Sequence, residues 1–170
     1  MATYHLRVKN DTKPSGKKVS AKRHAEYILR EEGNAHADYI NREGAQSNKD
    51  DCVFKGNQLP KWAKASPQKF FNAATRYEDK GNRRYKEIEL SLPNELTLAQ
   101  NRTIVDTFIA NHLANHYYAY AIHEKAGELS GERHPHVHIM FSERLIDDVE
   151  KIQTTCMKCE LTSQESRMKC

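Results

Sequence analysis

The sequence predicts an α+β fold with a largely antiparallel central sheet and flanking helices, and three observations point to this class. Segments that alternate apolar and polar residues, as strands do, are mixed with segments whose apolar residues recur every three or four positions, as in helices. Two alternating segments, residues 117–123 and 136–142, are expected to form an antiparallel hairpin with a long loop. The order of strands and helices has no regular βαβ repeat, which favours α+β over a parallel sheet.

The first expected elements are a strand and a helix. Residues 3–8 suit a short strand, and a connection rich in Lys, Gly and Pro follows. Ser20 fits the N-cap of a helix that ends at Gly33. Its apolar stripe consists of Ala21, Ala25, Ile28 and Leu29. Residues 49–65 are expected to be irregular, with Trp62 as an anchor.

Two further helices begin at recognisable caps. Ser66 and Pro67 fit the N-cap and first position of a helix that stops near Gly81. Thr97 and Gln100 fit a capping box, and the apolar stripe of the helix that follows is clear. Between these helices, residues 84–92 alternate as a strand, which predicts that two carboxylates share one strand face. These carboxylates belong to Glu87 and Glu89.

Histidines supply the most informative motif. His134, His136 and His138 alternate along the strand that follows the hairpin loop, so their imidazoles are predicted to project from one face while the intervening apolar residues enter a core. Pairing of the two hairpin strands would bring His123 opposite them. Three imidazoles can bind a divalent ion and leave coordination positions open. We expect the ligands to be His123, His136 and His138, with His134 as the alternative third ligand.

A second pattern places a tyrosine between a histidine and an arginine. Residues 24–30, HAEYILR, are echoed by residues 36–42, HADYINR. In a helix, the histidine three residues before each tyrosine and the arginine three residues after it lie on one face. A phenol beside a cation suits a position next to a phosphate, and tyrosines at the edge of a packed helix would give the same pattern. The candidates for a nucleophile are Tyr27 and Tyr39.

The charge distribution and the length of the chain limit the classes of function and the number of domains to consider. Residues 1–86 hold 19 Lys and Arg against 10 Asp and Glu, whereas residues 87–170 hold 8 against 13. A basic half is typical of proteins that bind a polyanion, and solvated surface charge explains the same counts equally well. The 170 residues suggest one domain over 1–151 and a polar, disordered or aberrant tail over 152–170.

The cysteines and the hydropathy exclude other classes. The four cysteines are too few and too unevenly placed for a disulfide framework, and the CxxC at Cys156 and Cys159 lacks the second pair that a zinc knuckle needs. No apolar stretch approaches the roughly 20 residues of a membrane span. We therefore expect a soluble, intracellular protein without membrane insertion.

Several motifs in order resemble the MobA/MobL family of plasmid mobilisation relaxases. They are a strand at 3–9, Ser20-Ala21 followed by Tyr27-Ile28, YINREG (39–44), LPKW (59–62), RYKEIE (84–89), LP (92–93), AIH (121–123) and HVHIMFSER (136–144). The resemblance covers about residues 1–151. After Lys151 the chain lacks the basic helical continuation usual in the family, which we interpret as a C-terminal truncation.

The resemblance implies the palm of the histidine-hydrophobe-histidine (HUH) relaxases and rolling-circle initiators. It implies that a tyrosine attacks one DNA strand at a plasmid origin of transfer, which leaves a 5′-phosphotyrosyl protein and a free 3′-hydroxyl. The metal ligands carry over as His123, His136 and His138, with Mn²⁺ or Mg²⁺ as the ion. Glu87 and Glu89 fall in the acidic strand near the metal, where they could position the ion or accept the tyrosine proton.

Other assignments follow from the same resemblance. The spacing from Ser20 favours Tyr27 as the nucleophile, while the motif YINREG favours Tyr39. The expected partners are single-stranded or supercoiled plasmid DNA, accessory mobilisation proteins and a coupling protein, in the bacterial cytoplasm. The expected DNA-binding residues are Arg23, Arg30, Arg42, Arg83 and Arg84.

Two alternatives remain at this stage. A rolling-circle replication initiator uses the same chemistry, but initiators often place the tyrosine after the histidine motif, and both candidates here precede it. A non-catalytic nucleic-acid-binding domain with a metal would show salt-dependent binding and no covalent adduct.

Overall fold

A computed structural model describes residues 5–10, 21–30, 51–77, 83–126 and 132–149. Five strands form one antiparallel sheet in the order β1-β3-β5-β4-β2, which confirms the predicted α+β class. The strands are β1 (Leu6–Asn10), β2 (Cys52–Gln58), β3 (Lys86–Ser91), β4 (His116–Ala126) and β5 (Arg133–Leu145). The helices are α1 (Ala21–Ile28), the 3-10 turn η2 (Lys61–Ala63), α3 (Pro67–Tyr77) and α4 (Leu98–His112).

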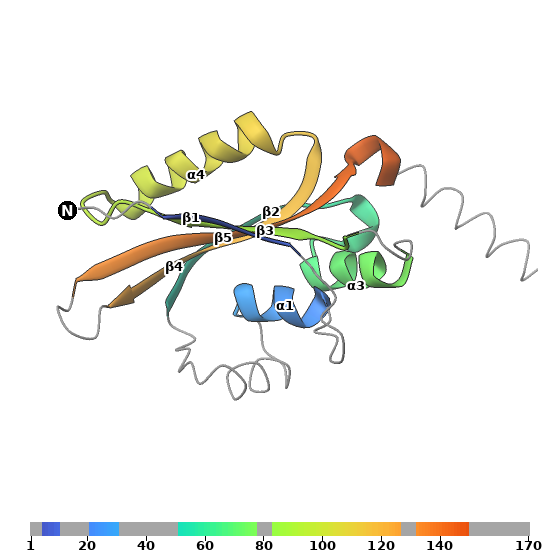
Figure 1. Ribbon diagram of the computed structural model, residues 1–170, viewed down its shortest axis with the longest axis horizontal. Coiled ribbons are helices and arrows are strands. Elements are labelled where there is room, and N and C mark those ends of the chain that lie inside the picture. The colour runs from blue at the N-terminus through green and yellow to red at the C-terminus, as the bar shows by residue number, and fades with distance from the viewer. Residues whose placement is uncertain (1–4, 11–20, 31–50, 78–82, 127–131, 150–170) are drawn as a thin grey trace, which may run out of the picture.

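The helices cover both faces of the sheet. In Figure 1, α4 lies along one face, and α1 and α3 lie against the opposite face. On the α4 side, Val105 and Ile109 pack on the fully buried Ile122, Val137 and Ile139. The strand alternation therefore works as predicted, because the residues between the histidines of β5 enter this core.

On the opposite face of the sheet, the central strand β4 contributes small side chains to the core. Ala119 and Ala121 of β4 face α1 and α3, and these alanines are buried against aromatic and aliphatic side chains of the two helices. Because these strand side chains are short, larger side chains of α1 and α3 fill the space above this face of the sheet. The helical contributors to this core include Ala25, Ile28, Phe70 and Phe71.

Several sequence predictions are confirmed by local structure. Thr97 caps α4 in a complete capping box with Gln100, as the pattern indicated. The backbone N–H of Lys69 donates to the hydroxyl of Ser66 before α3. The alternating segment 84–92 contains β3, and the two histidine-bearing strands form the expected hairpin.

Two predictions of extent are wrong. The first helix was expected to reach Gly33, but α1 ends at Ile28. Arg30 takes the left-handed conformation at φ 50°, and its guanidinium donates to the Tyr27 carbonyl, which satisfies an oxygen that a longer helix would have used. The first strand also ends later than expected, since β1 runs over Leu6–Asn10 where the end was predicted at Val8; residues 3 and 4 of the predicted strand lie outside the described residues.

The segment 49–65 was expected to be irregular, and most of it is ordered. β2 occupies Cys52–Gln58 and pairs with β4. A register shift between Cys52 and Phe54 breaks the alternation that would have marked a strand in the sequence. Trp62 does anchor the segment, because its ring packs 6.0 Å from that of Phe70.

Gly56 provides a test of the packing between β2 and β4. A Cβ at this position would lie 2.5 Å from Cε1 of Tyr120, whose hydroxyl donates to Asp106 and whose ring is buried. Because the ring is held at both ends, Gly56→Ala should lower the free energy of unfolding by about 1–3 kcal/mol, as measured by urea denaturation.

Lys55→Ala, on the same strand but exposed, is the matched control and should change stability by less than about 0.5 kcal/mol. In a Tyr120→Leu background the penalty of Gly56→Ala should shrink. An equal penalty in both backgrounds would contradict the steric explanation.

Candidate metal and tyrosine site

Three imidazoles converge on the sheet face that α1 covers. The register of β4 and β5 places His123 opposite His136, and His138 follows on the same face. The ring centroids of His123, His136 and His138 lie 5.2 to 5.5 Å apart. Three imidazoles bound to one tetrahedral ion would have centroids roughly 5 Å apart, given metal–nitrogen distances of about 2.1 Å. The spacing of the rings therefore suits a single ion.

Hydrogen bonds orient two of these rings. Nδ1 of His138 donates to Glu87 at 2.7 Å, and Nδ1 of His136 donates to the carbonyl of His134 at 3.1 Å. Both acceptors lack protons, so Nδ1 is the donor in each ring, and Nε2 is the nitrogen that a metal ion could use. An oxygen acceptor on the non-ligating nitrogen is the arrangement found around metal-binding histidines.

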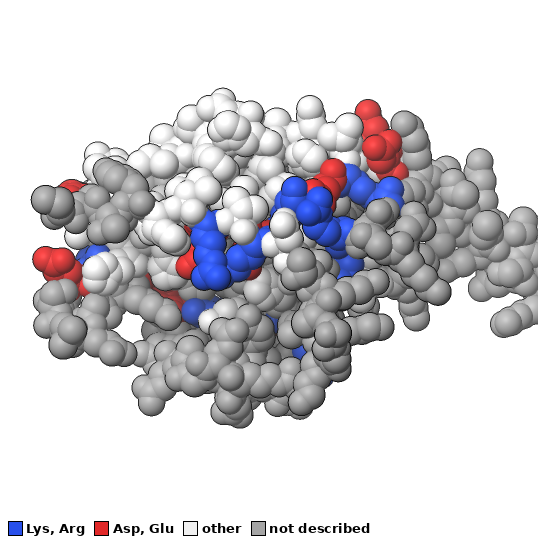
Figure 2. Space-filling view, in the orientation of Figure 1, with Lys and Arg blue, Asp and Glu red and all other residues white. Residues whose placement is uncertain are grey.

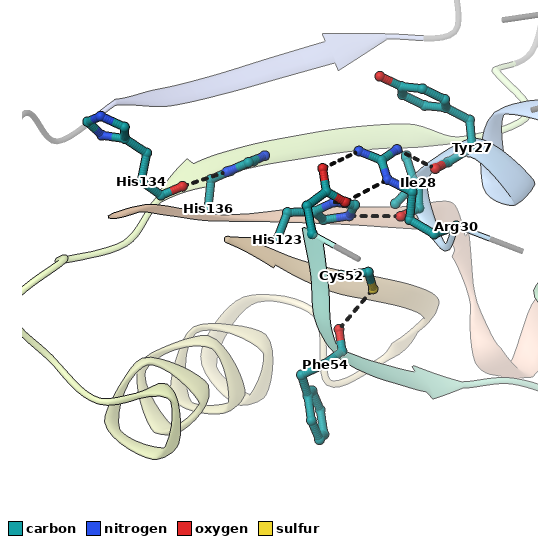
Figure 3. Close-up of polar contacts among 9 residues, drawn as sticks. Tyr27, Ile28, Arg30, Cys52, Phe54, His123, His134 and His136 are labelled. Carbon is teal, nitrogen blue, oxygen red and sulfur yellow. Dashed lines mark hydrogen bonds and ion pairs between the residues drawn. The ribbon is translucent and has the colours of Figure 1, made fainter. Parts of the chain in front are cut away.

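His123 is held differently. Its ring is fully buried, Nε2 donates to the Ile28 carbonyl at 2.8 Å, and Nδ1 lies 3.3 Å from Asp51 (Figure 3). Burial, reinforced by the positive charge of Arg30, lowers the pKa of His123 to about 3. The imidazole is therefore neutral at physiological pH, as a metal ligand must be. Ligation through Nε2 requires His123 to leave the Ile28 carbonyl.

Ligand atoms come together most closely beside this trio. Within the described ranges, the group whose possible ligand atoms all lie within 4.8 Å of one another is Glu87, Glu89 and His138. A lysine offsets part of the charge of these carboxylates, because Nζ of Lys9 lies 2.8 Å from Glu89 and 3.6 Å from Glu87. Among the described residues, the nitrogens of His123, His136 and His138 do not meet this distance limit together, although their rings lie close to one another.

Glu87 is the buried centre of this polar group. Its side chain is 1% exposed, and its two oxygens accept from His138 and from Nε2 of His24 at 2.7 and 2.8 Å. Burial alone would raise the pKa of the Glu87 carboxyl, but the hydrogen bonds from His138 and His24 outweigh it and hold the pKa far below its usual range. Glu87 therefore stays ionised and links α1 to β5.

Tyr27 lies on α1 between the two predicted neighbours. The His24 ring is stacked at 6.5 Å from the Tyr27 ring, as the helical spacing predicted, and the Arg30 guanidinium carbon lies 4.8 Å from the centre of the Tyr27 ring although Arg30 is beyond the end of α1. Arg30 is buried and donates to both oxygens of Asp51 at 2.9 and 3.0 Å. Figure 3 shows the same guanidinium reaching the Tyr27 carbonyl. The end of α1 is thus fastened to the residue that precedes β2.

The other predicted site residues are placed less centrally. His134 is exposed, and Figure 3 shows its ring turned away from His123, so only its carbonyl joins the group. Glu89 pairs with Lys9. The second tyrosine motif, with Tyr39 and Arg42, lies outside the described residues.

The predicted DNA-binding arginines divide into two kinds. Arg23 is exposed on α1, and Arg83 is exposed beside Glu143, to which it donates at 2.7 Å. Arg30 and Arg84 are buried, at 8% and 7% exposure. Arg30 and Arg84 are therefore less accessible than Arg23 and Arg83, and their role in DNA binding stays a prediction.

Sequence reasoning missed two residues of this site, Lys9 and Asp51, and one contact, between His24 and Glu87. Lys9 reaches the acidic pair because β1 pairs with β3 and sets Lys9 opposite Glu87. Asp51 was overlooked with β2, although a single acidic residue before a strand gives little signal by itself. His24 was noted as part of the repeat, but its bond to Glu87 joins residues far apart in the chain.

The basic residues are also gathered on the surface. Figure 2 shows Lys and Arg side chains in a band across the middle of one face, with a few acidic groups among them. Some of this charge is locally paired, since Lys86 and Arg83 both contact Glu143. The surface therefore carries a positive band in which some of the basic side chains form ion pairs with neighbouring acidic residues.

These features define an α+β protein whose antiparallel sheet carries converging imidazoles beneath a tyrosine-bearing helix. The family model of the MobA/MobL family matches residues 15–170, and the chain belongs to this family. The family resemblance expected from the sequence motifs is thereby confirmed.

The chain is similar to two curated relatives and to one solved structure. It is 38% identical over 152 residues to the "43 kDa relaxation protein" of Salmonella typhimurium and 35% identical over 154 residues to "Mobilization protein A" of Escherichia coli. Each match covers 89% of this chain, but only 37% and 19% of the respective relatives.

The solved structure was published as "Molecular Basis of Vancomycin Resistance Transfer in Staphylococcus aureus". It matches with a TM-score of 0.59 and 22% identity, over 84% of this chain and 71% of that one. This likeness supports the fold. Separately, none of the helices in the described ranges is both long enough and apolar enough to cross a membrane.

Glu87→Gln should destabilise the protein by about 2–3 kcal/mol at pH 7, because the amide cannot accept from both imidazoles. The lowered pKa of Glu87 predicts how this difference varies with pH. Below the ordinary carboxyl pKa of 4.5, the unfolded chain takes up a proton that the folded chain does not, so wild-type stability falls by up to about 1.4 kcal/mol per pH unit. The difference between wild type and variant should therefore shrink in acid.

Urea denaturation at pH 7, 5, 4 and 3 measures this trend. Glu143→Gln is the control, since Glu143 is also ion-paired but lies at the surface. A wild-type advantage that stayed constant down to pH 3 would refute the buried, ionised state of Glu87.

Proposed function

We propose that this chain is a DNA strand transferase that nicks one strand of plasmid DNA for mobilisation. The observation that carries the proposal is the convergence of three imidazoles beside the helix of Tyr27. The names of the two relatives, a relaxation protein and a mobilization protein, support a role in plasmid transfer. Because the chain spans a minor part of their lengths, the activity is assigned here to the region that it shares with them.

The metal would be held by His123, His136 and His138. Of the two expected ions, Mn²⁺ accepts imidazole ligands more readily than the harder Mg²⁺, and both commonly serve phosphoryl chemistry. When bound, the ion would supply positive charge to a phosphate oxygen in the transition state. The chain's own part is to hold the imidazoles in the correct tautomer through Glu87 and the His134 carbonyl.

Tyr27 is the nucleophile in this proposal. Its ring lies near the Arg30 guanidinium, where positive charge can stabilise the negative charge that develops on the phenol oxygen during attack. The phenol oxygen forms a bond to the scissile phosphorus, and the bond from phosphorus to the 3′-oxygen breaks. The phenol proton leaves to a base, and the departing 3′-oxygen takes up a proton, so that the products are a 5′-phosphotyrosyl protein and a 3′-hydroxyl.

The roles of the two glutamates follow from their contacts. Both oxygens of Glu87 already accept from imidazoles, so Glu87 suits the orientation of His138 better than removal of the tyrosine proton. Glu89 is half-buried and paired with Lys9, which leaves it closer to solvent. Of the two, we assign any contact with the ion or the proton to Glu89.

DNA would be bound by exposed basic residues. Arg23 on α1 and Arg83 before β3 are placed to contact phosphates, and such contacts would make binding strongly salt-dependent. Supercoiled or single-stranded DNA at an origin of transfer is the proposed substrate. Accessory mobilisation proteins and a coupling protein are the proposed partners.

Tyr27→Phe should abolish the covalent adduct with single-stranded origin DNA, with a loss of at least about 10³-fold, because the attacking oxygen is removed. The adduct is measured as an SDS-resistant band in the presence of Mn²⁺, and the modified residue is mapped by mass spectrometry. Tyr39→Phe is the matched control and should retain the adduct. An adduct that survives in Tyr27→Phe and disappears in Tyr39→Phe would assign the nucleophile to the other tyrosine.

A wild-type protein that binds DNA with a steep salt dependence, but forms no adduct at any Mn²⁺ concentration, would instead be a binding module.

His136→Ala should weaken Mn²⁺ binding by at least about 100-fold, because it removes a ligand, whereas His134→Ala should change it by less than about threefold. The two residues lie on the same strand, so the pair controls for general effects on β5. Isothermal titration calorimetry with Mn²⁺ measures both. Equal losses in the two variants would show that His134 is a ligand.

A further inference from the structure

His24 is a buried histidine that the proposed chemistry does not use. Its side chain is 9% exposed, and Nε2 donates to Oε2 of Glu87 at 2.8 Å. The other oxygen of the same carboxylate accepts from Nδ1 of His138 at 2.7 Å. One carboxylate therefore connects a helix residue three positions before Tyr27 to an imidazole of the proposed metal site.

The ring of His24 has a second set of contacts. It stacks at 5.3 Å and 20° on Tyr85, which is itself buried against Phe71 of α3. On its own helix it is stacked with Tyr27 at 6.5 Å and 24°. These ring contacts fix the plane of the imidazole, so its N–H points along a constrained direction to Glu87.

The contacts of Glu87 show why this donor matters. The carboxylate is almost completely buried, and a buried charge needs a hydrogen-bond donor on each oxygen. Lys9 lies 3.6 Å from Oε1, on the His138 side, so His24 supplies the donor to Oε2. Without it, the Glu87 carboxylate would be free to rotate, and the orientation of His138 would no longer be fixed.

We infer that His24 is a positioning residue that sets the orientation of the His138 imidazole through Glu87 and thereby tunes divalent-metal binding from the tyrosine helix. This inference rests on the proposed function for the identity of the ion. The residue acts through Glu87 and touches neither substrate nor metal. A change at His24 should alter the affinity for the metal, whereas a change at Tyr27 should alter the step in which the bond to phosphorus forms.

Two substitutions at position 24 separate its hydrogen bond from its packing. His24→Phe keeps a ring that can stack on Tyr85 but removes the donor, whereas His24→Gln loses the ring and keeps an N–H that can reach Glu87. Mn²⁺ affinity, measured by calorimetry, should fall by about 10-fold in His24→Phe and by less than about threefold in His24→Gln. Excess Mn²⁺ should restore adduct formation by His24→Phe.

Losses of affinity that are equal in the two variants, or absent from both, would overturn the inference. Circular dichroism establishes that each variant is folded. If His24→Phe does not fold, ¹⁵N-histidine NMR of the wild-type protein without metal decides the matter, because the inference requires the proton on Nε2 of His24 and on Nδ1 of His138. A proton on Nε2 of His138 would refute it.

The same experiments distinguish this inference from the proposed function. Absence of a DNA adduct from the wild-type protein would count against strand transfer, while the difference in Mn²⁺ affinity between the two variants would still support positioning by His24. Absence of Mn²⁺ binding by the wild type would overturn the tuning of metal affinity together with the metal assignment, and the NMR result would still report whether His24 and Glu87 orient His138.

Discussion

The buried carboxylate of Glu87 is the constraint on which the site depends. An ionised carboxylate loses its hydration when it is buried, and it persists only where donors replace the water. Here the donors come from α1 and β5, with the Lys9 ammonium of β1 nearby, while Glu87 itself belongs to β3. Four elements from distant parts of the chain are therefore held in one arrangement by the need to satisfy a single charge.

A second polar group holds the same helix at its other end. Arg30 donates two hydrogen bonds to Asp51. His123 donates to the Ile28 carbonyl, and its other ring nitrogen faces Asp51. The helix that carries Tyr27 is thus tied to both of the strands that carry the imidazoles. The position of the phenol relative to the histidines is set by directional hydrogen bonds as well as by apolar packing, and such bonds are sensitive to displacements of a few tenths of an ångström.

One face of the sheet carries mainly apolar packing, and the opposite face carries the polar residues of the site. On the α4 face, Val137 and Ile139 are completely buried and fix the register of the central strands by ordinary apolar packing. A slip of one residue would move the imidazoles of β5 to the wrong face. On the opposite face, Ala119 and Ala121 leave space for α1, and the polar residues of the site occupy the region toward the hairpin loop.

The sequence by itself determined the class of fold, the hairpin, the faces of its strands and the convergence of His123, His136 and His138, because all of these follow from period-2 alternation and short-range pairing. It also placed His24 beside Tyr27, since a spacing of three residues is fixed within a helix. Arg30 lies beyond the end of α1 and reaches the Tyr27 ring from a left-handed conformation. Only the tertiary structure decided which partners those side chains have.

The pairing of β1 with β3 brought Lys9 to the acidic strand, and the bulged start of β2 brought Asp51 to Arg30. The physical reason is that contacts between elements far apart in the chain depend on register and on helix docking, which the packing of the whole core selects. No local pattern encodes them.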